Sequence, residues 1–215
     1  MAPRPGGPAG ASTLGPVVER LRALQQGAST PLVVAIDGRS GAGKSTVARH
    51  LAGELHAALI PCDDFFAADI PASGWDARSP AQRATDALDW RRLRSEVIEP
   101  LRTGAVARWF PFDFAAGVRA DGTYAMRTVP TEQVPRPVVL LDGAYSARPE
   151  LADIMDYAIL VEAPELWRRS RLAARERPQF LAEWHARWDA AEEYYFTRVR
   201  PPSTFDLVLA LDGAA

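Results

Sequence analysis

The 215-residue sequence contains very few residues of three reactive types: one cysteine, Cys62, one lysine, Lys44, and three scattered histidines. A single cysteine excludes an internal disulfide and a cysteine-rich metal site, and the histidines give no support for a His-based one. No apolar run approaches the ~18 residues that would span a bilayer. The first residues lack the apolar core of a signal peptide, so we expect a cytoplasmic protein with no membrane partner.

Charges of the two signs nearly cancel, with 25 basic and 27 acidic side chains, a net charge of −2 and a pI near 6.0. This balance argues against a nucleic-acid partner. A hydrophobic content of 47% argues against disorder of the whole chain. Every basic residue except Lys44 is arginine. Because arginine serves wherever else the chain needs a cation, position 44 indicates a specific need for an ammonium group.

Five short apolar runs predict buried strands, and they alternate with stretches of helical periodicity. The runs are LVVAI from position 32, HAALIP, PVVLLDG, YAILVEAP and FDLVLAL. We expect a disordered tail over 1–16, a single domain over 17–215, and a loop-rich segment over 67–87. Strands alternating with helices predict an α/β fold with a mostly parallel five-stranded sheet and helices on both faces.

Residues 38–45, GRSGAGKS, match the phosphate-loop motif G-x-x-x-x-G-K-[ST] in full, between a predicted strand and a predicted helix. Glycines let the backbone approach an anion closely, and successive N–H groups with the helix N-terminus then face a phosphate. Lys44 would place its ammonium on the β- and γ-phosphates, where an arginine fork is too wide. The expected nucleotide-binding residues are Gly38, Ser40, Gly41, Ala42, Gly43, Lys44, Ser45 and Thr46.

The motif predicts the three-layer P-loop NTPase fold and a bound nucleotide. GTPases normally recognise guanine through N-K-x-D, which a chain without a second lysine cannot carry. We therefore expect ATP, with Mg²⁺ held by the Ser45 hydroxyl and by Asp142, directly or through water. Asp142 ends an apolar strand in the manner of a Walker B element. A plain strand-end cap is the alternative role for Asp142.

Two carboxylates, Asp63 and Asp64, follow the second predicted strand. Side chains just beyond the carboxyl ends of parallel strands line the ligand crevice. A carboxylate there can accept the proton of a hydroxyl that attacks the γ-phosphate. The alternative is that the aspartates cap a helix.

An arginine-rich helix is predicted near the C-terminus, within a lid of about 164–180. Arg168, Arg171 and Arg175 fall at i, i+3 and i+7 on one helical face, which could close over a triphosphate. Arg171 and Arg175 are the first candidates for stabilising the transferred charge. A solvated charged face is the alternative.

The phosphate loop followed by Asp63-Asp64-Phe65-Phe66 resembles the uridine kinase and phosphoribulokinase-like family, which includes nicotinamide riboside kinases. The family pattern there is D-x-F-[FY]. Further segments resemble family stretches in the same order: 86–90 with 101–104, 110–114, 139–143 and the arginine helix. The likeness covers about residues 31–210.

The resemblance implies an ATP-dependent kinase that phosphorylates a hydroxyl of a small molecule, with Asp63 as the base and a nucleoside or ribose-like polyol as the acceptor. It implies that Lys44, Arg171 and Arg175 join Asp63 in catalysis. The implied acceptor-binding residues are Asp63, Asp64, Phe66, Phe112 and Arg119. The sequence does not determine the oligomeric state, and a homo-oligomer is one alternative.

Two positions depart from the family pattern. Gly117 stands where uridine-phosphorylating members carry a histidine, and Phe112 replaces a tyrosine. Sites that recognise polar groups do so through buried partners, so losing two of them argues against uridine itself. Two alternatives follow: a kinase for a non-nucleoside hydroxyl, such as a sugar acid, a pantothenate-like alcohol or an antibiotic, or a nucleotide-binding switch without catalysis.

Overall fold

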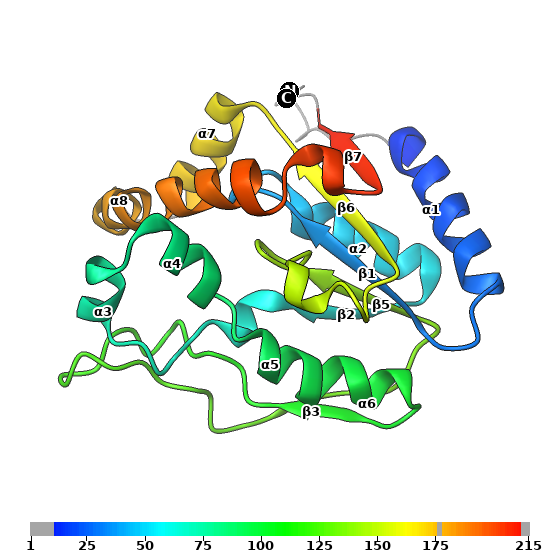
Figure 1. The fold of residues 1–215 in the computed structure, drawn as a ribbon, viewed down its shortest axis with the longest axis horizontal. Coiled ribbons are helices and arrows are strands. Elements are labelled where there is room, and N and C mark those ends of the chain that lie inside the picture. The colour runs from blue at the N-terminus through cyan, green and yellow to red at the C-terminus, as the bar shows by residue number, and fades with distance from the viewer. Residues whose placement is uncertain (1–10, 176–177, 212–215) are drawn as a thin grey trace, which may run out of the picture.

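A computed structural model describes residues 11–175 and 178–211 and has a five-stranded, all-parallel sheet at its centre (Figure 1). The strand order is β2-β5-β1-β6-β7. The strands are β1 (Leu32–Asp37), β2 (Ala58–Pro61), β5 (Val138–Asp142), β6 (Tyr157–Glu162) and β7 (Leu207–Ala210). All five coincide with the predicted apolar runs, so the predicted fold class is confirmed.

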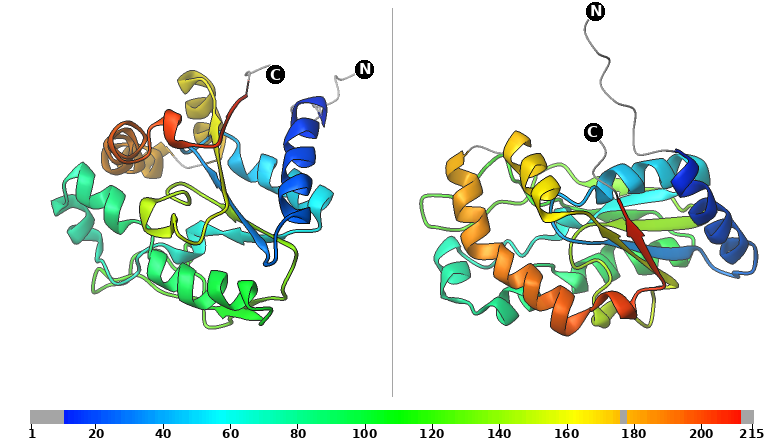
Figure 2. Two further views of the ribbon diagram at one scale, coloured as in Figure 1. Left: turned by 45° about the vertical axis from the view of Figure 1, so that its right-hand side comes forward. Right: turned by 90° about the horizontal axis from the view of Figure 1, so that it is seen from above.

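Helices cover both faces of this sheet, as expected for a three-layer α/β fold (Figure 2). On one face, α1 (Ala11–Gln26) and α2 (Lys44–Leu55) pack on alternate strand residues such as Val34 and Ile36. On the other, a continuous helical segment packs on Val33 and its neighbours, together with α8 (Pro178–Tyr194) and the helical turn Tyr195–Val199 that follows it. That segment comprises α5 (Trp90–Arg92), a wider turn Leu93–Ile98 and α6 (Glu99–Arg102).

Smaller elements surround the carboxyl ends of the strands (Figure 1). Helix α7 (Glu165–Arg175) and α8 form a hairpin of helices above the sheet, and α4 (Pro80–Asp86) packs on α8. Helix α3 (Ala72–Ala77) precedes α4. An antiparallel pair, β3 (Ala107–Trp109) with β4 (Thr131–Gln133), lies beyond α6.

The start of the first helix differs from expectation. Helix α1 begins at Ala11 and not at 17, because the apolar spacing that places Val17, Val18 and Leu21 in the core extends back to Leu14, which is buried. The rest of the expected tail, 1–10, lies outside the described residues.

The segment 67–87 is also more ordered than predicted, since it contains α3 and α4. Helix α4 begins with a reciprocal capping box between Ser79 and Gln82, a signal that the sequence carries in S-P-A-Q.

No helix in the described part of the chain is long and apolar enough to cross a membrane.

Candidate active site

The phosphate loop connects the buried strand β1 to helix α2, at the edge of the sheet where all five strands end. Gly38 and Gly41 have φ angles of 147° and 78°. A Cβ at Gly38 would collide with the carbonyl oxygen of Val161 on β6, and one at Gly41 would lie 2.6 Å from that of Arg168 on α7. Glycine is therefore required at both positions by backbone angle and by close approach.

The loop is fixed by hydrogen bonds of its own. The ammonium of Lys44 donates to the carbonyl oxygens of Gly38 at 2.7 Å and Arg39 at 3.1 Å. The amide of Ala42 donates to Arg39, and Gly43 caps α2 in a left-handed conformation. At the start of α2 the amides of Thr46 and Val47 donate to the carbonyl oxygen of Gly43, and the N-terminus of a helix favours an anion. The arrangement suits an anion that Lys44 would neutralise.

Asp37, a residue that the sequence did not single out, supports the start of the loop. Its buried carboxylate accepts hydrogen bonds from the amides of Gly38, Tyr145 and Ala147 at 2.7, 2.9 and 3.0 Å, and from the hydroxyl of Tyr195 at 2.9 Å. Burial raises the pKa of Asp37, whereas these donors and Lys44 lower it. This one side chain thereby connects β1, the segment after β5 and the helical turn Tyr195–Val199 that follows α8.

The two predicted magnesium ligands lie together. Burial raises the pKa of the Asp142 carboxyl, and the neighbouring side chain of Ser45 lowers it. The Oδ1 atom of Asp142 is buried and has no partner among the described residues. An orphaned carboxylate oxygen beside a hydroxyl fits an oxygen-ligated cation, which in nucleotide sites takes one or two side chains plus phosphates and water.

Asp63 sits in a short 3₁₀ helix, Cys62–Phe65, directly after β2. Its side chain is accessible to solvent, yet protein atoms surround it densely enough that desolvation raises the pKa of its carboxyl. Lys44 and Arg175 act electrostatically in the opposite direction. The carboxylate therefore shares one electrostatic environment with the phosphate-loop lysine and a lid arginine. This is the setting that a base for an attacking hydroxyl requires.

Asp64 is held differently from Asp63. Its Oδ2 accepts a 2.8 Å hydrogen bond from the indole Nε1 of Trp109 on β3, and its carbonyl oxygen accepts from the amide of Phe112. Burial raises the pKa of Asp64, and the Trp109 bond lowers it. Asp64 thus joins the 3₁₀ helix to β3 and to the segment carrying Phe112.

The three predicted lid arginines all approach the loop or its neighbourhood. Arg168 donates to the carbonyl oxygen of Ser40 at 3.3 Å. The guanidinium of Arg171 stacks on Trp167 and lies against Gly43. Arg175 lowers the pKa of Asp63. Because they lie on the helical face predicted from their spacing, charge from α7 is directed at the loop.

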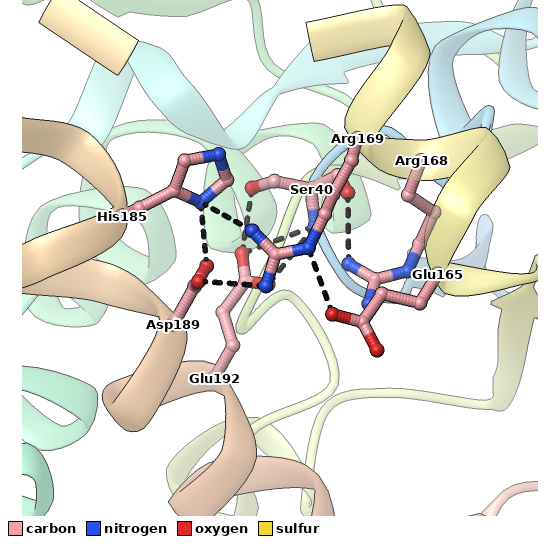
Figure 3. Close-up of polar contacts among 7 residues, drawn as sticks. All are labelled: Ser40, Glu165, Arg168, Arg169, His185, Asp189 and Glu192. Carbon is pink, nitrogen blue, oxygen red and sulfur yellow. Dashed lines mark hydrogen bonds and ion pairs between the residues drawn. The ribbon is translucent and has the colours of Figure 1, made fainter. Parts of the chain in front are cut away.

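Ser40 also belongs to the predicted nucleotide-binding set. Its amide and hydroxyl both donate to the carboxylate of Glu192 on α8 (Figure 3). Sequence reasoning missed Glu192, which lies 152 residues away in the chain.

Phe66 is the centre of an aromatic cluster and packs on every other member, with ring centroids 5.0–6.4 Å apart. The members are Phe66, Trp75, Phe112, Phe114, Tyr124 and Trp188. Phe112 is buried within it, whereas Phe114 is 57% exposed. Arg119 and Gly117 lie outside the cluster on an exposed turn, and a Cβ at Gly117 would meet open space.

A cavity of about 580 Å³ borders the loop at Arg39 and extends along the ends of β6 and β7. Apolar groups of Pro164, Phe196 and Leu211 contribute to its walls. Its size and lining suit an organic group attached to a loop-bound phosphate.

Fold and loop together define the P-loop class of three-layer α/β proteins. No protein-family model and no curated protein sequence matches the chain. Solved structures share its fold: a possible uridine kinase from Bacillus stearothermophilus has a TM-score of 0.62 at 17% identity and covers 90% of this chain and 99% of its own.

A D-glycerate 3-kinase from Cryptococcus neoformans var. grubii has a TM-score of 0.65 at 14% identity, covering 95% and 96% of the two chains. A putative fructose transport system kinase from Silicibacter sp. TM1040 has a TM-score of 0.61 at 23% identity, and the match covers 87% of this chain and 98% of the other.

Proposed function

We propose that the protein is an ATP-dependent kinase that transfers the γ-phosphate to a hydroxyl of a small molecule. The observation that carries this proposal is the position of Asp63 directly after β2, at the same edge of the parallel sheet where β1 leads into the phosphate loop. Lys44 and Arg175 lower the pKa of Asp63 there, against the larger effect of burial. A nucleotide-binding switch needs the loop and the lysine but has no use for a carboxylate base beside them. The three structural neighbours described above carry kinase names, which supports this choice.

In the proposed reaction, the acceptor hydroxyl gives its proton to the carboxylate of Asp63 as its oxygen attacks the γ-phosphorus. The bond from phosphorus to the bridging oxygen breaks, and ADP leaves. Lys44, Arg171 and Arg175 stabilise the negative charge that moves toward the leaving group. Ser45 and Asp142 would hold Mg²⁺, which when bound supplies charge neutralisation on the phosphates.

For the acceptor we propose a nucleoside or another ribose-like polyol. A non-nucleoside hydroxyl compound is a second candidate, and a specific observation favours it. Phe112 offers no hydroxyl and is buried among aromatic rings, and Gly117 offers no side chain on its exposed turn. Neither position can hydrogen-bond a pyrimidine base through a side chain.

An ATP-consumption assay over a panel of nucleosides, sugars, sugar acids and pantothenate-like alcohols tests the proposal, with the Lys44→Ala variant as the blank. We expect one acceptor class to stimulate ADP formation in the wild type only. ATP binding without stimulation by any panel member would instead support the switch. Uridine as the best substrate would contradict the argument from Phe112 and Gly117.

A further inference from the structure

Glu192 is one of few charged side chains in the described part of the chain that the fold buries, with only 3% of it exposed. Both of its carboxylate oxygens lie 3.1–3.2 Å from the amide nitrogen of Ser40, and Oε1 also accepts from the Ser40 hydroxyl at 2.6 Å. Burying a carboxylate is costly unless it is well hydrogen-bonded, so this geometry points to a use for the charge.

The carbonyl side of Ser40 is held by helix α7. Its carbonyl oxygen accepts from the guanidinium of Arg168, and the backbone of Arg168 lies against Gly41. Figure 3 shows Ser40 between these two side chains, with Arg168 coming from α7 and Glu192 from α8. One residue of the phosphate loop, Ser40, is therefore held by α8 at its amide and hydroxyl and by α7 at its carbonyl oxygen.

This clamp has a consequence for the loop's amides. The N–H of Gly38 is committed to Asp37 and that of Ser40 to Glu192, so two protein carboxylates hold the first half of the loop. The amide of Ala42 donates to Arg39 and that of Thr46 to Gly43. Among the described residues, the loop amides left to face a phosphate are therefore those of Gly41, Gly43, Lys44 and Ser45. The direction in which these amides point depends on where residues 38–40 are held.

We infer that Glu192 is a positioning residue that, acting through Ser40, sets the phosphate-binding conformation of the loop and makes it depend on the lid lying against the loop. This inference rests on the proposed function. Nucleotide affinity and lid position are then coupled through one carboxylate.

Glu193 provides a matched control on the same helix. Its side chain is 63% exposed and pairs with Arg39 at 2.7 Å. An exposed ion pair of this kind contributes little to stability. Glu192→Gln keeps the shape but can accept with one oxygen only, whereas Glu192→Ala removes both acceptors. Ser40→Ala removes the hydroxyl contact and keeps the backbone amide.

Calorimetry with ATP and Mg²⁺ measures the effect without a known acceptor. We expect Kd to rise about tenfold or more in Glu192→Ala, less in Glu192→Gln, and less than twofold in Glu193→Gln. If Glu192 acts through Ser40, the losses of Glu192→Gln and Ser40→Ala are non-additive in the double variant. Equal affinities for wild type and both Glu192 variants, or additive losses, would overturn the inference.

Hydrogen exchange supplies a readout that a general loss of stability does not move. In Glu192→Gln, amide exchange should accelerate in residues 38–43 and in α7 but not in the central strands. Uniform acceleration over the sheet would instead assign Glu192 a purely structural role. A wild-type protein that binds no nucleotide would refute the proposed function, whereas a binding wild type with unchanged Glu192 variants refutes only this inference.

Discussion

The indole Nε1 of Trp109 donates a 2.8 Å hydrogen bond to Oδ2 of Asp64 and leaves the neighbouring carboxylate, Asp63, with Lys44 and Arg175. The bond gives the two adjacent aspartates different surroundings, whereas the sequence distinguishes them only through the family resemblance, which implies Asp63 as the base. One has a local structural partner, and the other lies in the electrostatic environment of the loop.

Asp63→Asn should abolish phosphoryl transfer, because an amide cannot accept the hydroxyl proton, while Kd for ATP changes by no more than a few-fold. Asp64→Asn should keep a substantial fraction of turnover, since its oxygen can still accept from Trp109. Steady-state kinetics with the acceptor found in the panel, together with calorimetry, measures both. An inactive Asp64→Asn beside an active Asp63→Asn would reverse the assignment.

The pH dependence of turnover should reflect the raised pKa of Asp63. The base works only when ionised, so kcat/KM should fall as pH decreases through a pKa above 3.8. Arg175→Ala removes a charge that lowers this pKa and should move the acid limb to higher pH. Arg108→Ala, at an exposed pair on β3, is the control and should leave the limb in place. An unmoved limb in Arg175→Ala would contradict the electrostatic effect of Arg175 on Asp63.

Lys44→Ala should reduce turnover by orders of magnitude, and Lys44→Arg should not restore it, because a guanidinium fork does not fit between the loop carbonyls that Lys44 contacts. Circular dichroism and the thermal midpoint should stay close to the wild type, since the lysine is not part of the core. Near-normal turnover in either variant would refute the role of the ammonium.

Asp37→Asn should destabilise the fold by about 3 kcal/mol, because the amide NH₂ would face donors where a buried carboxylate now accepts four hydrogen bonds. Urea unfolding at neutral pH measures the change. Asp153→Asn is the control: this aspartate is 62% exposed in its pair with Arg94, and its loss should change the free energy of unfolding far less than Asp37→Asn does. Equal losses of unfolding free energy in the two variants would contradict the structural role of the buried Asp37 carboxylate.

The sheet was predictable from the sequence because buried parallel strands are nearly continuous apolar runs, and the phosphate loop because its glycines and lysine have fixed spacing. The start of α1 was missed because residues 1–16 are rich in proline, glycine and alanine and show no clear period, although Leu14 continues the apolar stripe. Periodicity assigns a face to a helix but does not name the segment against which it packs.

For that reason the supporting contacts of the site could not be predicted. Trp109 with Asp64 and Glu192 with Ser40 join segments 45 and 152 residues apart. A partial signal existed for Glu192, which shares a helical face with Tyr195 and Phe196, both buried. A carboxylate on such a face needs a partner, but the sequence does not say which one.

The half-buried ammonium of Lys44, bonded to two carbonyls of the loop, has a practical consequence. In a chain whose other cations are guanidinium groups, amine-directed reagents have one side-chain target besides the α-amino group. A label attached there needs no engineered cysteine, and its rate of attachment measures directly how well a ligand shields that nitrogen.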